Sequence, residues 1–351
     1  GEEVTRNIHR VFGGQQFNFP KRLYSKEYVI RYLKENYNGK NVRKLAKELD
    51  YSERWVQAII NKNNIIIKEI SDFDLQQTLE CGQCFRFYKQ DEQDYVVVAY
   101  GRLLHIMEKD NNLVFLNKTI KEVENIWIPY FDLNRDYEKI KEFLLKSDET
   151  LEPAIKEKNG VRILNQEFVE TLISFIISQN KQIPHIKHIV KTISENFGDY
   201  LGEVNGEKYY SFPNMKQLSN ITEADFREMK TGFRAPYLSD AVKKLSTGII
   251  NEKEIRMLKE EDARKKLMEI KGVGEKVANC VMLFSLGYRQ AFPIDVWIKR
   301  IMETLYFNGK DTSKEIIGKC AKELYGEYGG YAQQYLFCFG RDNKVGKNKN
   351  E

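Results

Sequence analysis

The sequence predicts an α+β protein that is mostly α-helical. Apolar residues recur at helical spacing near the start of the chain, short β-rich runs follow, and helical spacing with short breaks returns from about Tyr137 to Gly340. We therefore expect a helix-turn-helix module, an antiparallel β-sheet domain, a larger helical domain and a flexible tail, at 1–64, 65–136, 137–341 and 342–351.

Composition narrows the class of protein. The chain has 351 residues, of which 42% are hydrophobic and 30% are charged, so overall disorder is excluded. No apolar run is long enough for a membrane span, and the first residues lack the apolar segment of a secretion signal, so we expect a cytoplasmic protein without a membrane partner. Five cysteines, an odd number in a long chain, argue against a disulfide framework.

The first module has the pattern of a helix-turn-helix. Val42, Leu45 and Leu49 repeat at helical spacing, and the pattern resumes over 56–60 after a break in which Ser52 is a natural N-cap. Residues 1–64 carry 13 Lys and Arg against 7 Asp and Glu, which suggests nucleic acid as partner. A three-helix module without DNA affinity is the alternative.

The β domain is predicted from three short runs. "YVVVAY", "LLHIME" and "LVFL" are separated by Gly101-Arg102 and by 110–112, which is typical of an antiparallel meander. Just before them, Cys81 and Cys84 form a C-G-Q-C pair. A redox or zinc site is a minor alternative there, because no second Cys pair or paired-His motif completes a ligand set.

A glycine turn in the helical domain carries the first chemical signal. In "EIKGVGEKVANC", Gly272 and Gly274 precede a helix whose N-terminal N–H groups can bind a phosphate oxygen, and Lys276 lies just inside that helix. Nineteen residues later, "FPIDVW" places Asp295 where it can cap the next helix. Either motif alone would indicate only a helix corner and a cap.

Together, the two motifs resemble the helix-hairpin-helix superfamily of DNA glycosylases, with its Gly/Pro-rich loop and following aspartate. The resemblance implies that Lys276 is the nucleophile that attacks the sugar and that Asp295 is the assisting carboxylate. A nearby carboxylate can stabilise the positive charge that develops on the sugar as the base leaves.

Four further segments resemble the 8-oxoguanine DNA glycosylase family over about residues 65–341. They are "LECGQCFRF", "ISFIISQNKQIPHI", "TGFRAPYL" and "GGYAQQYLF". By this resemblance the Gly82 carbonyl accepts from the N7–H of 8-oxoguanine, Cys280 and Phe337 enclose the flipped base, and Gln333 reads its polar edge. The implied activity is a bifunctional glycosylase and AP lyase on duplex DNA that contains 8-oxoguanine, in bacteria at the nucleoid.

Further residues resemble those that contact DNA in this family. Phe233 matches the aromatic wedge, and Asn180 with Arg234 matches the pair that binds the unpaired cytosine. Two positions depart from the animal enzymes and resemble the clostridial branch. His185 replaces an arginine, which puts strict cytosine discrimination in doubt, and Trp297 replaces a histidine and is expected near the DNA backbone.

No cofactor is required by these resemblances. Only Cys320 and Cys338 follow the hairpin, so the four-cysteine iron–sulfur cluster of other superfamily members is not expected. The hairpin could hold a monovalent or divalent cation weakly, through the carbonyls of Met268, Ile270 and Val273.

The first module resembles the Mor type of transcription activator over about residues 8–63. "VFGGQQFNFPKR" is similar to the strand of that family, which implies a homodimer through this module. Two other functions remain open for the whole chain: a transcription regulator without catalysis, and a glycosylase for alkylated bases, which would not need the nucleophilic lysine.

Overall fold

The chain divides into two units, residues 1–62 and 63–351, in the computed structural model. The structure describes residues 6, 7, 9–11, 13, 24–37, 41–67 and 70–346. The division falls close to the predicted boundary at residue 64. The predicted dimerisation strand, 11–22, lies outside the described residues apart from Val11 and Gly13.

Three helices of the first module confirm the helix-turn-helix prediction: α2 (Lys26–Asn36), α3 (Val42–Leu49) and α4 (Glu53–Asn63). Ser52 accepts a hydrogen bond from the Trp55 N–H at 3.3 Å, which is the predicted N-cap. Ala46, near the end of α3, is buried. The shared apolar core consists of Val29, Leu33, Leu45, Ala46, Leu49, Val56 and Ile60.

A five-stranded antiparallel sheet opens the second unit, in the order β1-β5-β4-β3-β2. The strands are β1 (Ile65–Ile67), β2 (Phe87–Asp91), β3 (Asp94–Ala99), β4 (Arg102–Lys109) and β5 (Asn112–Leu116). The three predicted runs are β3, β4 and β5, so the meander is confirmed. Asp110 and Asn111 have φ values of +50° and +59°, which Asp and Asn tolerate better than other residues with a side chain.

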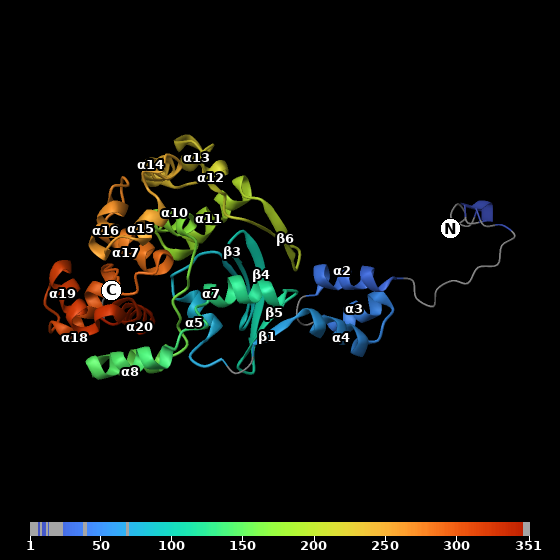
Figure 1. Cartoon of the computed structure of the whole chain (residues 1–351), viewed down its shortest axis with the longest axis horizontal. Coiled ribbons are helices and arrows are strands. Elements are labelled where there is room, and N and C mark those ends of the chain that lie inside the picture. Colours follow the sequence, from blue (N-terminus) through green and yellow to red (C-terminus); the bar gives the residue numbers. More distant parts are fainter. Residues whose placement is uncertain are drawn as a thin grey trace. The chain divides into compact units, whose positions relative to one another are not determined.

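Helices make up most of the rest of the second unit and lie beside the sheet in Figure 1. The α-helices are α5 (Leu75–Glu80), α6 (Ile120–Glu122), α7 (Ile128–Tyr130), α8 (Tyr137–Ser147), α9 (Glu152–Glu157), α10 (Phe168–Ser178), α11 (Ile183–Phe197), α12 (Met215–Leu218), α13 (Glu223–Glu228), α14 (Ala235–Ser246), α15 (Glu252–Arg256), α16 (Glu260–Met268), α17 (Glu275–Val281), α18 (Val296–Tyr306), α19 (Lys314–Tyr325) and α20 (Gly329–Asp342). Short 3₁₀ or π turns lie at η1 (Val123–Trp127), η2 (Glu149–Leu151), η3 (Gly232–Arg234), η4 (Met282–Leu286) and η5 (Gly326–Tyr328).

The prediction that residues 137–340 are nearly all helical is wrong at one place. Strands β6 (Tyr200–Val204) and β7 (Glu207–Tyr210) form a hairpin whose turn is Asn205-Gly206, with φ values of +53° and +84°. Asn-Gly is a strong signal for such a turn. The hairpin packs Tyr209 against Val96 and Val98, so it covers the sheet face that points away from α5.

The predicted flexible tail begins too early at residue 342. Helix α20 includes Asp342, whose carboxylate pairs with Lys158 at 2.7 Å, and the Asn343 side chain donates to Glu157 at 2.9 Å. Val345 packs against the helical core. These contacts come from residues far earlier in the chain, and the polar composition of the tail does not reveal them.

Buried polar side chains join the sheet domain to the helices. The Arg162 guanidinium donates to the carbonyls of Ser71, Asp72, Asp132 and Arg135. A buried charge is stable only when its donors are satisfied, and here the backbone carbonyls of residues 71–72 and 132–135 satisfy them.

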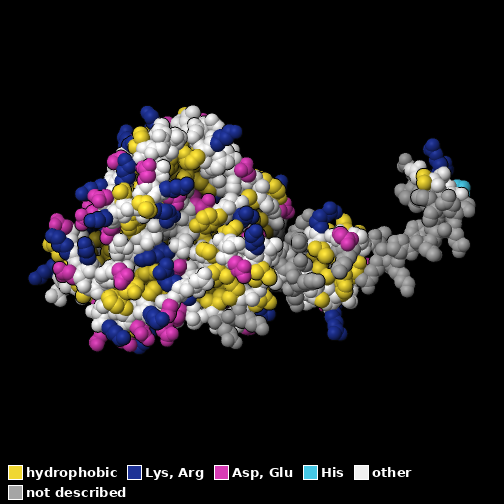
Figure 2. All heavy atoms as spheres, viewed as in Figure 1, with side chains coloured by type: hydrophobic (Ala, Val, Ile, Leu, Met, Phe, Trp, Pro, Cys, Tyr) yellow, Lys and Arg dark blue, Asp and Glu magenta, His cyan; other side chains and the backbone are white. Residues whose placement is uncertain are grey.

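On the face visible in Figure 2, acidic and basic side chains of the second unit are interspersed. Among the described residues no helix is long and apolar enough to cross a membrane.

Glu170 supplies a pH-dependent contribution to stability. Burial raises its pKa to about 7, opposed by Arg86 and reinforced by the Glu167 charge. Because the folded state holds this proton more tightly than the unfolded state, stability should fall as pH rises from about 4.5 to about 7. Glu170→Gln stays neutral at every pH. The melting temperature of this variant minus that of the wild type should therefore increase between pH 5 and pH 8, as measured by thermal unfolding followed by circular dichroism. Exposed Glu138→Gln is the control, and a difference independent of pH would contradict the assignment.

Candidate active site

The glycine hairpin between α16 and α17 lies against the start of α14. Gly272 has a φ of +78°, and a Cβ at this position would overlap the ring of Tyr237. The Lys271 N–H donates to the Asp240 carboxylate at 2.7 Å, which fixes the hairpin to the same helix. Gly274 is the N-cap of α17 and brings no side chain to the cap, so the first N–H groups of the helix stay available to an anion.

Lys276 and Asp295 line one narrow cavity of about 40 Å³. Its other lining residues are Cys81, Gly82, Phe175, Cys280, Phe284, Pro293, Gln333, Gln334 and Phe337. All six residues predicted for catalysis and base binding are therefore brought together. They come from the loop after α5, from α17, from the N-cap of α18 and from α20, which are far apart in the sequence.

The two predicted catalytic side chains are held differently. Lys276 is half-buried, and its Nζ lies 5.2 Å from the centroid of the Phe175 ring. Asp295 caps α18 by accepting a hydrogen bond from the Ile298 N–H at 2.8 Å through Oδ1. Among the described residues Oδ2 has no hydrogen-bond partner, so this oxygen remains available to the cavity.

The walls of the cavity suit a flat aromatic ligand. Burial raises the pKa of the Cys280 thiol to about 11, partly offset by Lys276, so at neutral pH the residue is an uncharged, polarisable wall. Gly82 has a φ of +88°, and a Cβ there would lie 3.5 Å from the Phe337 ring. The neighbouring Gln83 side chain accepts from the Leu164 N–H at 2.9 Å and donates to the Arg162 carbonyl at 2.7 Å, which fixes the Gly82 loop.

The cavity is too narrow for a base in this structure. A volume of about 40 Å³ has room for only a few water molecules, whereas a purine base has eleven or more heavy atoms. A base can therefore enter only if lining side chains move apart. Phe337 and Lys276 are only partly buried, so they are the lining residues we expect to move.

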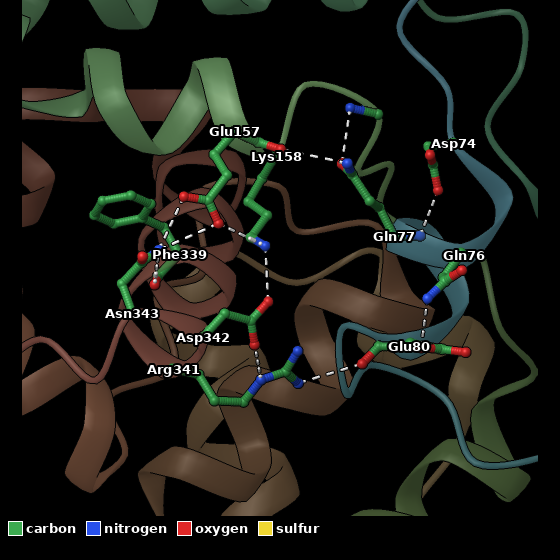
Figure 3. Close-up of polar contacts among 11 residues, drawn as sticks. Asp74, Gln76, Gln77, Glu80, Glu157, Lys158, Phe339, Arg341, Asp342 and Asn343 are labelled. Atoms are coloured by element: carbon green, nitrogen blue, oxygen red, sulfur yellow. Dashed lines mark hydrogen bonds and ion pairs between the residues drawn. The ribbon is translucent and has the colours of Figure 1, made fainter.

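A polar network braces α20 behind the cavity (Figure 3). Arg341 lies 5.8 Å from the centroid of the Phe337 ring, and it donates to the Glu80 carbonyl at 3.2 Å and to Asp342 at 2.8 Å. Asp342 also pairs with Lys158 at the end of α9. The network thus ties the helix that carries Phe337 to the segment just before Gly82.

The residues predicted at the opposite strand form a second group. Phe233 is 53% exposed, and Asn180, with a φ of +49°, is exposed in the turn between α10 and α11. Arg234 is only 3% exposed, and its guanidinium donates to the carbonyls of Gln179 and Asn180. It therefore holds the Asn180 turn in this structure, and it would have to rotate outward to contact a cytosine.

The remaining predicted positions lie at helix starts. His185 is exposed in the first turn of α11. Trp297 is half-exposed in the first turn of α18 and packs against the helical core, so its predicted contact with the DNA backbone stays a prediction.

Cys81 and Cys84 are buried free thiols that donate to the carbonyls of Thr78 and Leu79. Among the described residues no group of three or more His, Cys, Asp or Glu side chains is arranged for a metal ion.

Sequence reasoning missed several residues of this site. Phe175 and Phe284 were indistinguishable from core residues, and Tyr237 gave no signal that it supports the hairpin. Gln334 did carry a signal, because two consecutive amides in "YAQQYLF" are unusual on a helix that is otherwise apolar.

Comparison with known proteins agrees with this geometry. Residues 65–172 match the model of the 8-oxoguanine DNA glycosylase N-terminal domain, and residues 173–326 match the HhH-GPD superfamily of base excision DNA repair proteins. One similar structure is a crystal structure of Clostridium acetobutylicum 8-oxoguanine glycosylase/lyase in complex with double-stranded DNA containing cytosine opposite to 8-oxoG. Its sequence is 39% identical to this chain. The match covers 81% of this chain and 97% of the other chain, with a TM-score of 0.78. The chain belongs to the 8-oxoguanine DNA glycosylase family.

Two curated members of this glycosylase family extend the comparison. A probable N-glycosylase/DNA lyase of Methanothermobacter thermautotrophicus is 30% identical over 76% of this chain and 93% of its own length. The N-glycosylase/DNA lyase of Saccharomyces cerevisiae is 32% identical over 74% of this chain and 76% of its own. Residues 1–69 match the Mor transcription activator family, as the sequence predicts for the first module.

The two hairpin glycines should respond differently to substitution. Gly272→Ala places a methyl group against Tyr237 at a φ that L-residues rarely adopt, so we expect a loss of about 2–4 kcal/mol in the free energy of unfolding. Gly274→Ala meets no atom within 4 Å and is the matched control. Urea unfolding of both variants measures the difference, and equal losses would show that the Tyr237 contact does not set the hairpin.

Proposed function

We propose that this protein is a bifunctional 8-oxoguanine DNA glycosylase and AP lyase that acts on duplex DNA. One observation carries the proposal: Lys276 and Asp295 line the same narrow cavity as Gly82, Cys280, Gln333 and Phe337. Binding DNA requires no such group of residues, so a regulator without catalysis is disfavoured. The names of the matched relatives support the same activity.

Base recognition begins when the damaged nucleotide leaves the helix, which costs a few kcal/mol. The exposed Phe233 is placed to fill the gap that the nucleotide leaves. In the cavity, the Gly82 carbonyl would accept from the N7–H of 8-oxoguanine. Guanine has no hydrogen on N7, so this contact distinguishes the damaged base from the normal one.

Excision would use the two side chains proposed as catalytic, Lys276 and Asp295. The unprotonated Nζ of Lys276 forms a bond to the sugar C1′ while the bond from C1′ to the base breaks, and the base leaves with that electron pair. The Asp295 carboxylate stabilises the positive charge that develops on the sugar. Ring opening gives an imine between Lys276 and C1′. Loss of a proton from C2′ then expels the 3′ phosphate oxygen and cuts the strand.

Borohydride reduction tests the imine directly. Wild-type protein incubated with an 8-oxoguanine duplex should give a covalent protein–DNA adduct, because borohydride reduces the imine to a stable amine. Lys276→Gln should give no adduct and should lose at least a thousandfold in excision rate, since it removes the nucleophile.

Lys271→Gln is the matched control, because Lys271 is an exposed lysine of the same hairpin and the substitution keeps its backbone N–H, which donates to Asp240. It should trap DNA as the wild type does. An adduct with Lys276→Gln would refute the nucleophile. Excision of alkylated bases without any adduct would favour the alkylated-base glycosylase.

Recognition of the opposite base should be looser than in the animal enzymes. His185 stands where those enzymes carry an arginine, and the Arg234 guanidinium is turned inward to the Asn180 turn. Fewer charged donors therefore face the unpaired base, which lowers the discrimination available from hydrogen bonds.

Single-turnover excision with cytosine, thymine, guanine or adenine opposite the lesion measures this preference. We expect rates within roughly tenfold of one another, as one charged hydrogen bond accounts for about that factor. His185→Arg should widen the spread in favour of cytosine. A steep preference for cytosine in the wild type would contradict the interpretation.

The first module would raise affinity for DNA or select where the enzyme acts. Its basic surplus and the exposed Arg43 and Arg54 of the helix-turn-helix support this role. A homodimer through this module and a place at the bacterial nucleoid are part of the same proposal. The proposal also includes a weakly bound cation at the hairpin carbonyls of Met268, Ile270 and Val273. The Ile270 carbonyl already accepts a hydrogen bond from the Val273 N–H at 3.0 Å.

A further inference from the structure

Gln334 follows Gln333 on α20 and is a buried polar side chain in the base cavity. Gln333 is 4% exposed and Gln334 is 3% exposed, and both line the cavity. A buried amide lowers stability unless its donors and acceptors are paired. The two amides together therefore require partners that the free protein supplies only in part.

The orientation of both amides follows from the Pro293 carbonyl. This oxygen can only accept, so the Gln333 side chain turns its Nε2 toward it, at 3.3 Å. The Oε1 of Gln333 then faces Gln334, which donates from its own Nε2 at 2.7 Å. Gln334 Oε1 is left over, and among the described residues this buried oxygen has no hydrogen-bond partner.

Four hydrogen-bonding groups of the pair remain unused. They are the second N–H of Gln333, the second lone pair on its Oε1, the Oε1 of Gln334 and the second N–H of Gln334. The first three, one donor and two acceptors, match the pairing edge of guanine, where O6 accepts and N1–H and the 2-amino group donate. The planar amide of Gln333 fits the adjacent O6 and N1–H, which leaves the 2-amino group for Gln334.

We propose that Gln334 Oε1 accepts a hydrogen bond from the 2-amino group of the flipped base, while its Nε2 holds Gln333 in position for O6 and N1–H. The assignment rests on the proposed excision of 8-oxoguanine and adds a second residue that reads the base. It makes the site selective for oxidised purines that carry a 2-amino group.

Two substrates that differ only in this group provide the test. Duplexes with 8-oxoguanine or 8-oxohypoxanthine opposite cytosine are compared in single-turnover excision. The wild type should excise 8-oxoguanine roughly tenfold faster or more, because the base without the 2-amino group leaves a buried oxygen unpaired. Gln334→Met, which has a similar length and no amide, should bring the two rates to within about twofold by slowing 8-oxoguanine excision more strongly.

Tyr335→Phe is the matched control, because it removes a buried, unpaired hydroxyl from the next residue, which does not line the cavity. The wild-type preference should survive in this variant. Equal wild-type rates on the two bases would overturn the proposal, and so would a Gln334→Met variant that slows both substrates by the same factor. The wild-type comparison needs no variant, so it decides the matter even if Gln334→Met does not fold.

Borohydride capture separates this proposal from the one on which it rests. If wild-type protein traps an 8-oxoguanine duplex but shows no preference for the 2-amino group, only the assignment of Gln334 fails. If the wild type traps no DNA, the proposed function fails as well.

Discussion

The contact between Gly272 and the ring of Tyr237 is the constraint on which the site depends. Because no Cβ fits between them, the hairpin lies directly on α14, and the Lys271 N–H reaches the Asp240 carboxylate of the same helix. This contact fixes where α17 begins. Lys276 is the second residue of α17 and Cys280 follows four residues later, on the same face. The position of the hairpin therefore also sets the position of Lys276, the proposed nucleophile.

Tyr237 contacts both the hairpin and the segment that carries Phe233. Its ring lies against Gly272, and the centroid of its ring is 6.1 Å from the centroid of the exposed Phe233 ring. If, as proposed, the hairpin binds a phosphate and Phe233 fills the gap in the base stack, Tyr237 in the first turn of α14 links these two contacts. That link would help to direct the flipped nucleotide toward Lys276.

The polar groups of the narrow cavity are partly paired within the protein itself. Gln333 and Gln334 bond to each other and to the Pro293 carbonyl, and Asp295 is partly satisfied as a helix cap. A site whose polar groups are oriented in advance can bind a base without rearranging its own dipoles. Arg341 supports the same arrangement from behind, since it lies against Phe337 and bonds to the segment that leads to Gly82.

The sequence by itself determined the order of the domains, the helix-turn-helix, the three central strands and the motifs around Lys276 and Asp295. Periodicity, cap residues and turn glycines encode these features locally, over a few residues. The edge strands β1 and β2 escaped prediction, and β6 and β7 were hidden among helices, because short strands owe their conformation to their partners.

Only the tertiary structure decided how the site is assembled. It brought Gly82 to Phe337, turned the Arg234 guanidinium inward, and left the oxygen of Gln334 unpaired beside the cavity. Such facts depend on contacts between residues more than fifty positions apart or on the direction in which an amide points. No local pattern carries that information, because it arises only when the whole chain packs.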